Sequence, residues 1–184
     1  MDNAAIEDHL LSAFPDAILL KRIEWAEGPT GDLPVGYTTL VIQRTSSMLA
    51  IATCGASRSD SEIELFILAP STTTESKQIE LVEALVAVAH YSATGPGLDA
   101  GHIINIGRPL VSGGSCTHCL VSLPYLDGPA LERPSVEPGT RFLWLVPITN
   151  KERLYALDKG TDALEALLEQ RHVDYLDFGR DSLV

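Results

Sequence analysis

The tetrapeptide Cys116-Thr117-His118-Cys119 has residue types and a spacing that could carry chemistry. Two cysteines so placed can form a thiol redox pair or supply half of a zinc site. A redox pair normally starts a helix, but residues 120–123 (Leu-Val-Ser-Leu) predict a strand. Zinc needs two further ligands, and Cys54 with a histidine could supply them only if the fold brings them close. We therefore expect ordinary semi-buried thiols and no metal ligands.

The histidines and glycine-rich turns offer no stronger candidate. His90 lies among apolar residues of a predicted helix, where a hydrogen-bonded boundary histidine is expected. His102 and His118 begin predicted strands and could approach each other. Residues 55–57 (Gly-Ala-Ser) lack the second glycine of a nucleophile elbow, and residues 113–115 (Gly-Gly-Ser) lack the lysine of a phosphate loop. The sequence thus predicts no catalytic residues.

Acidic residues dominate the charge of the chain, which has a formal net charge of −12. That charge argues against nucleic acid as a partner, because phosphates would be repelled. It fits simple solubility, or electrostatic steering towards a basic protein partner. Glu62 and Glu64 alternate at the start of a predicted strand, and in so acidic a chain we expect them to form a solvated face.

The N-terminus and the cysteine content indicate a cellular compartment. Met1 to Ala4 begin no positively charged segment followed by an apolar one, so no secretory signal is expected. No apolar run approaches the roughly 20 residues that a membrane span requires. Three cysteines, an odd number, do not suggest a disulfide framework. We expect a cytoplasmic protein with reduced thiols and no membrane partner.

Hydrophobic periodicity predicts strands joined by short connections, with a few helices between them. Helices are expected near residues 3–14, 76–92 and 150–159, and a further one capped by Thr161. Strands are expected near 17–25, 37–43, 48–53, 62–69, 102–106, 118–124 and 141–147, with a possible strand at 175–176. Residues 27–36 and 125–139 are expected to be irregular. This order predicts an α+β class: a single domain over residues 1–184, with a mixed, largely antiparallel β-sheet packed with about four α-helices.

The stretch from Phe142 to Glu152 predicts a strand, its end and the start of a helix. Its bulky apolar residues favour a strand buried on both faces. Pro147 cannot donate to a central ladder, so the strand should end there or become edge-like. Thr149 and Glu152 have the spacing of a capping box, in which each side chain accepts a hydrogen bond from the other residue's backbone amide.

Several segments together resemble one family in order and spacing. They are Thr53-Cys54-Gly55-Ala56-Ser57, Glu64 to Pro70, Ala89-His90-Tyr91, Gly101 to Leu110, Leu123-Pro124-Tyr125, Phe142 to Thr149 with Glu152, and Arg180 with Ser182. The pattern resembles the suppressor of fused domain in its stand-alone bacterial form. The resemblance covers about residues 36–184, while residues 1–35, a predicted helix and strand, match loosely.

This resemblance implies a protein-binding α+β domain without catalytic residues or a cofactor. Bacterial relatives of this kind are often immunity proteins, so the implied partner is a toxin domain, and a basic one would suit the charge. The family landmarks are implied to be structural: Thr53, Gly55, Ser57, Glu64, Pro70, Gly101, Pro124, Trp144, Pro147, Thr149 and Glu152. Gly55 and Gly101 suit turns with positive φ, Pro70 and Pro147 suit strand ends, and Trp144 suits a core position.

Two alternatives and one question stay open at the sequence level. The chain could be a thiol-dependent or metal-dependent enzyme that uses Cys116, Cys119 and Cys54. It could instead be a small-ligand sensor with a pocket near the loops at residues 53–57 and 101–115. The oligomeric state is open, because an unpaired edge strand could pair with a second copy.

Overall fold

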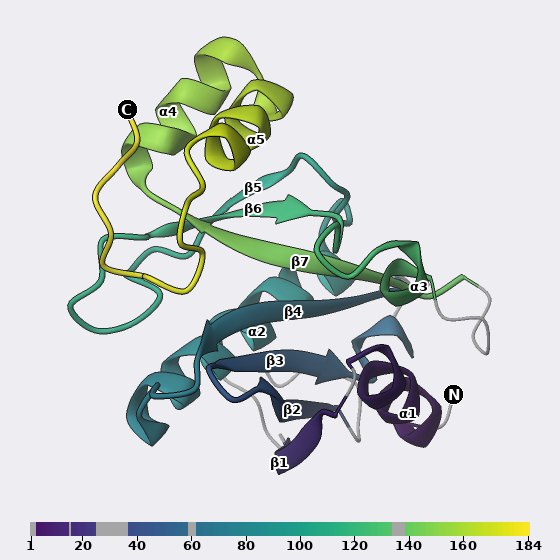
Figure 1. Cartoon of the computed structure of the whole chain (residues 1–184). Coiled ribbons are helices and arrows are strands. Elements are labelled where there is room, and N and C mark those ends of the chain that lie inside the picture. Colours follow the sequence, from purple (N-terminus) through teal and green to yellow (C-terminus); the bar gives the residue numbers. More distant parts are fainter. Residues whose placement is uncertain (1–2, 15, 25–36, 59–61, 134–138) are drawn as a thin grey trace.

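A computed structural model describes residues 3–14, 16–24, 37–58, 62–133 and 139–184 (Figure 1). The whole of the predicted loop at residues 27–36, together with the last residue of the strand predicted for residues 17–25, lies outside the described residues. The described chain builds one sheet with helices on both of its faces.

The sheet has seven strands in the order β1-β2-β3-β4-β7-β6-β5. All pairs are antiparallel except β4 and β7, which run parallel at the centre. The strands are β1 (Ile18–Glu24), β2 (Thr38–Thr45), β3 (Met48–Cys54), β4 (Ile63–Pro70), β5 (Ile103–Asn105), β6 (His118–Ser122) and β7 (Arg141–Ile148). The mixed, largely antiparallel sheet and the α+β class are confirmed.

Five α-helices occur among the described residues, one more than the approximate number predicted. They are α1 (Asn3–Ala13), α2 (Glu75–Thr94), α3 (Pro129–Glu132), α4 (Asn150–Lys159) and α5 (Thr161–Gln170). The extra helix, α3, is a single turn with proline in its first turn, where a missing N–H costs nothing. The possible strand at residues 175–176 is absent from the described chain, since residues 171–184 form turns and irregular structure.

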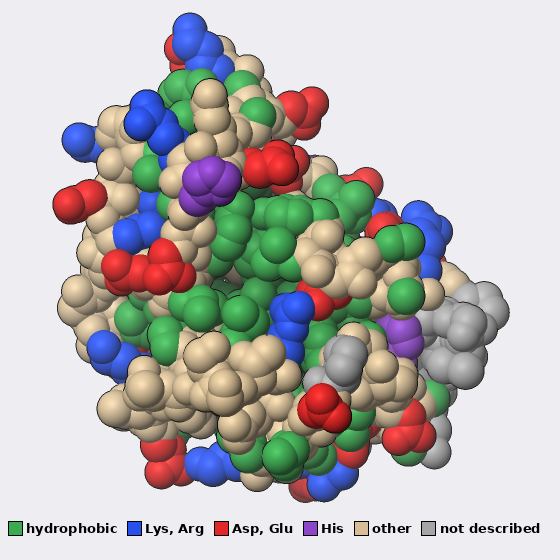
Figure 2. Space-filling model, in the orientation of Figure 1, with side chains coloured by type: hydrophobic (Ala, Val, Ile, Leu, Met, Phe, Trp, Pro, Cys, Tyr) green, Lys and Arg blue, Asp and Glu red, His purple; other side chains and the backbone are tan. Residues whose placement is uncertain are grey.

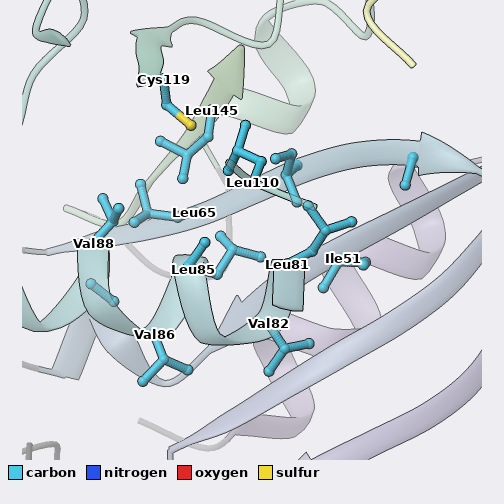
Figure 3. Packing of buried hydrophobic residues seen from close by; sticks show 14 of the residues in the cluster. Ile51, Leu65, Leu81, Val82, Leu85, Val86, Val88, Leu110, Cys119 and Leu145 are labelled. Carbon is cyan, nitrogen blue, oxygen red and sulfur yellow. The ribbon is translucent and has the colours of Figure 1, made fainter. Parts of the chain in front are cut away.

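The helices cover opposite faces of the sheet and create two hydrophobic cores. Helix α2 packs on one face, where Leu85 and Val88 lie beside Leu65 of β4 and Leu81 lies near Leu110 (Figure 3). Helices α1, α4 and α5 pack on the other face, against a cluster that contains Phe66, Leu68, Phe142, Trp144 and Val146. Because side chains alternate along β4 and β7, each central strand contributes to both cores.

The capping box predicted at the end of β7 is confirmed. The Thr149 hydroxyl accepts from the Glu152 amide at 3.3 Å, and the Glu152 carboxylate accepts from the Thr149 amide at 2.8 Å. Strand β7 runs one residue beyond Pro147, but at Pro147 it is edge-like, the second of the two predicted outcomes, because only β6 still pairs with it there. Pairing with β4 stops at Trp144, and the Pro147 carbonyl accepts from Arg180, so the missing N–H falls where no strand needs it.

Within the described residues, no helix combines the length and the apolar character that crossing a membrane needs.

Candidate functional site

Glu64 gathers three of the other landmarks around one buried carboxylate. Its oxygens accept from the Gly55 amide at 2.9 Å, the Ser57 amide at 2.9 Å, the Ser57 hydroxyl at 2.7 Å and the Thr53 hydroxyl at 2.5 Å. Thr53 in turn accepts from the Leu65 amide at 2.8 Å. Gly55 has φ 101°, as predicted for its turn.

The burial of Glu64 corrects the prediction that Glu62 and Glu64 share a solvated face. Glu64 is fully buried, whereas Glu62 is exposed and lies just before β4. A buried carboxylate is costly unless donors surround it, and here four donors do so. Both oxygens are occupied by the protein's own groups, so this cluster ties the end of β3 and the turn at Gly55 and Ser57 to the start of β4.

Glu152 forms the second buried carboxylate cluster, with Arg180 as its partner. The guanidinium meets both carboxylate oxygens, at 2.5 Å and 2.9 Å, and Glu152 also accepts from the amides of Thr149 and Leu183. Burial opposes the charge of Glu152, but these hydrogen bonds outweigh it and lower the pKa of the carboxyl overall. The cluster ties the C-terminal segment to the start of α4.

The remaining landmarks also have structural positions. Pro70 is the last residue of β4, as predicted, and Trp144 is buried in the core. Gly101 has φ 88°, and a Cβ there would lie 3.2 Å from the Thr161 hydroxyl, so the turn needs glycine. The Pro124 carbonyl closes a turn by accepting from the amides of Asp127 and Gly128.

The cysteines do not converge on a common site. Cys116 and Cys119 are buried in the core against α2, whereas Cys54 lies in the core on the other face of the sheet. Burial raises the pKa of the Cys116 thiol to about 11 and also raises that of Cys119, so both are poor nucleophiles at neutral pH. Among the described residues, no three His, Cys, Asp or Glu side chains are grouped closely enough to hold a metal ion.

The free edge of β5 is the feature best suited to take a ligand. The Val121 amide donates to the His102 carbonyl at 2.8 Å, and the Ile106 amide donates to the Thr117 carbonyl at 3.1 Å. Bonded and unbonded residues alternate along an antiparallel strand, so the backbone groups of Ile103 and Asn105 face away from β6. No described strand pairs with them.

Two apolar hollows flank this edge and share Tyr91, Ile103 and Ile104. One, of about 290 Å³, lies between β5 and α2. The other, of about 360 Å³, continues around the edge to Leu157 of α4. Leu157 is 68% exposed and Tyr91 46%, so both side chains are available for contact with a ligand. We call the residues that line these two hollows, together with the free edge of β5, the β5 groove.

The opposite edge of the sheet, β1, is protected against pairing. Its register shifts between Leu19 and Lys21, which marks a bulge. The strand also carries two charged residues in its middle, Lys21 and Arg22. Lys21 pairs with Glu75 of α2, and Arg22 pairs with Glu7 of α1. Bulges and charges are the usual means by which proteins block edge strands, and β5 has neither between Ile103 and Asn105.

The sequence leaves open a ligand pocket near residues 53–57 and 101–115. The first of these loops is filled by the Glu64 cluster, but the β5 groove includes part of the second. The sequence signal for the groove is a group of three isoleucines, at positions 103, 104 and 106, between the glycines at positions 101 and 107. They indicate a short apolar strand, but periodicity does not reveal that it lies at an edge.

Comparison with known proteins gives one family. The sequence model of the suppressor of fused protein (SUFU) family matches residues 40–181. A solved SUFU (suppressor of fused protein) homolog from Neisseria gonorrhoeae FA 1090 is 29% identical, with a TM-score of 0.86, and the match covers 99% of this chain and 96% of that one.

Two further structures share the fold at low identity. The Sufu-Fu complex crystal structure matches with a TM-score of 0.61 at 16% identity, over 97% of this chain and 91% of that one. Drosophila Suppressor of Fused matches with a TM-score of 0.63 at 15% identity, over 97% of this chain and 50% of that one. No curated protein matches the chain.

Proposed function

The chain belongs to the suppressor of fused protein (SUFU) family, and from this premise we propose that it is a non-catalytic protein-binding domain whose β5 groove takes an extended segment of a partner. The observation that carries the proposal is the unpaired outward backbone of Ile103 and Asn105 between apolar hollows. The name of the Sufu-Fu complex, which has the same fold, states that Sufu is bound there to a partner, Fu.

An extended segment fits the groove better than a small molecule does. The outward N–H and C=O groups of β5 can form a ladder with an added strand, and alternate side chains of that strand can enter the two hollows. Because β5 has only three residues, backbone pairing alone would be weak. Most of the affinity would come from burial of Tyr91 and Leu157, which are large and exposed.

The partner class that we propose is a basic toxin domain, which the chain would neutralise as an immunity-type protein. The support is the net charge of −12, which would steer a basic partner towards the chain and speed its capture. Binding without catalysis is enough for this role, and the landmark clusters at Glu64 and Glu152 then serve as scaffold.

We also propose that residues 1–184 act as one domain. The match to the N. gonorrhoeae homolog, over 99% of this chain and 96% of that one, supports this.

The test is capture of the protein encoded by the neighbouring gene, co-expressed with the wild-type chain and with two variants. Leu157→Glu places a charge in the groove and is expected to weaken binding by about tenfold or more. Leu154→Glu is the matched control, because Leu154 is on the same helix, is 50% exposed and lines neither hollow. It should bind like the wild type.

A second variant addresses the backbone pairing directly. Asn105→Pro removes the outward N–H of β5 and keeps the inward bonds to β6, so the domain should stay folded while binding falls. Circular dichroism and thermal unfolding would verify the fold. Equal capture by wild type, Leu157→Glu and Asn105→Pro would overturn the groove, and absence of any captured neighbour product would overturn the partner class.

A further inference from the structure

An aromatic cluster lies on the face of the sheet opposite α2. The ring of Trp144 is 5.3 Å from that of Tyr125 and 4.9 Å from that of Tyr175, and it stacks parallel to Phe66 at 6.4 Å. The Tyr125 hydroxyl donates to the Tyr175 hydroxyl at 2.8 Å. These contacts fix the ring of Tyr125 although that residue lies on a connecting loop.

The outer side of this cluster is open to solvent. Tyr125 is 49% exposed, and its neighbours Leu123 and Leu126 are 38% and 50% exposed. Figure 2 shows a hollowed hydrophobic area at the centre of this face, below the α4–α5 pair, with acidic side chains at its upper rim. Exposed aromatic and leucine side chains held in a fixed position are typical of a contact surface.

Two carboxylates of α5 lie beside the cluster. Glu165 accepts from the Ser122 hydroxyl at 2.5 Å, and Ser122 is directly opposite Trp144 in the β6–β7 pair. Side chains of opposite residues lie on the same face of a sheet, so Glu165 is close to Trp144. Burial raises the pKa of Tyr125, and the hydrogen bond to Tyr175 and the negative charges of Glu165 and Glu169 raise it further.

These two carboxylates differ from the other acid near the loop. Asp127 is paired with Arg44, whose guanidinium also lies 4.9 Å from the ring centre of Phe14. Within the described part of the chain, neither Glu165 nor Glu169 forms an ion pair. The aromatic surface is therefore bordered by negative charge that the protein does not balance itself.

We propose that this aromatic–acidic patch (Leu123, Tyr125, Leu126, Tyr175, Glu165 and Glu169) binds an arginine side chain of a partner protein. A guanidinium can stack on the exposed face of Tyr125 while its N–H groups donate to a carboxylate of α5. Lysine lacks the flat face and the forked donors that this geometry favours. Leu123 and Leu126 would cover the aliphatic part of the arginine side chain.

The patch goes beyond the β5 groove, because it uses the 123–126 loop and the outer part of α5 and none of the strand β5. Its occupant is a single cationic side chain, whereas the groove takes a backbone segment. The two surfaces can therefore be tested separately, and the patch can be tested with a probe that does not require the natural partner.

The probe is an acetylated, amidated tetrapeptide of arginine, compared with the same peptide made of citrulline, which has the same shape without the charge. In a Trp25→Phe background Trp144 is the sole tryptophan, so its indole NMR signal reports on the patch. We expect a saturable shift of that signal with the arginine peptide, and binding weaker by about tenfold with the citrulline peptide.

Charge-matched variants separate the patch from general attraction to an acidic protein. Glu165→Gln with Glu169→Gln should weaken arginine binding about fivefold, whereas Asp8→Asn with Glu24→Gln, which removes two exposed charges on α1 and β1, should change it less than about twofold. Tyr125→Leu should also weaken binding by removing the aromatic face. Equal binding of the two peptides, equal effects of the two charge variants, or no shift at Trp144 would each overturn the proposal.

Discussion

Glu64 and Glu152 are both fully buried carboxylates, but different groups satisfy them. Glu64 is surrounded by neutral donors from the end of β3 and from the turn that follows it. Glu152 is paired with a guanidinium from Arg180 near the C-terminus, and with two backbone amides. The Glu64 cluster stabilises a turn close to Glu64 in the sequence, whereas the Glu152 cluster holds a segment that is distant from Glu152 in the sequence.

The difference shows which region supports the binding surfaces. The segment tied by Arg180 carries Tyr175, which holds Tyr125 in the aromatic–acidic patch, and Phe178, whose carbonyl accepts from the amides of Ser115 and Cys116. The Glu64 cluster contributes no residue to the patch or to the β5 groove. Loss of the Glu152 cluster should therefore affect binding as well as stability, whereas loss of the Glu64 cluster should affect stability alone.

The largest effect is expected from Arg180→Met. It leaves the charge of Glu152 buried without its partner, which should lower the free energy of unfolding by about 3–5 kcal/mol. Urea unfolding measures this. Adding Glu152→Gln removes the uncompensated charge, so the double variant should be more stable than Arg180→Met alone. A double variant no better than the single one would mean that the ion pair is not what Arg180 contributes.

A smaller effect is expected from Glu64→Gln. The amide keeps one acceptor oxygen but places an NH₂ group against donors, so one or two hydrogen bonds are lost, at a cost of about 1–3 kcal/mol. Glu62→Gln, at an exposed position, is the matched control and should change stability by less than about 0.5 kcal/mol. Similar losses from both changes in a urea titration would contradict the account of the Glu64 cluster.

The smallest effect concerns pH and separates the ion pair from other acids. The folded pKa of Glu152 is lowered, so its contribution to stability is present above its unfolded pKa, about 4.3, and is lost as pH falls through the folded value. Each pKa unit by which folding lowers the pKa of Glu152 contributes about 1.4 kcal/mol to the free energy of unfolding. The free energy of unfolding, measured between pH 6 and pH 3, should therefore fall less steeply with decreasing pH in the Arg180→Met, Glu152→Gln double variant than in the wild type.

Features that depend on neighbouring residues could be predicted from the sequence. The capping box of Thr149 and Glu152 and the strand before it were predicted correctly because each is a local pattern. The α+β class was predicted correctly from the order of these local elements. The resemblance to the suppressor of fused family is confirmed by the family match over residues 40–181.

Features that depend on the pairing of distant segments could not be predicted from the sequence. The alternation of Glu62 and Glu64 suggests a solvated face, but β4 is central in the sheet and buried on both faces, which depends on its pairing with β3 and β7. The β5 groove exists only because β5 is last in the strand order, which the pairing of β6 with β7 and of β7 with β4 determines. The patch needs Tyr175 and Glu165 beside Tyr125, which comes from a loop far from both of them in the sequence.

The parallel pair at the centre of the sheet has a consequence for how the chain reaches this structure. Strands β1 to β4 can form by successive hairpins, and β5 to β7 by antiparallel pairs, but Ile63 meets Arg141 only after a long loop closes. Such non-local contacts delay folding, because the entropy of closure is lost before they form. The β4–β7 junction should therefore set the refolding rate, and slower refolding of Leu143→Ala would show it.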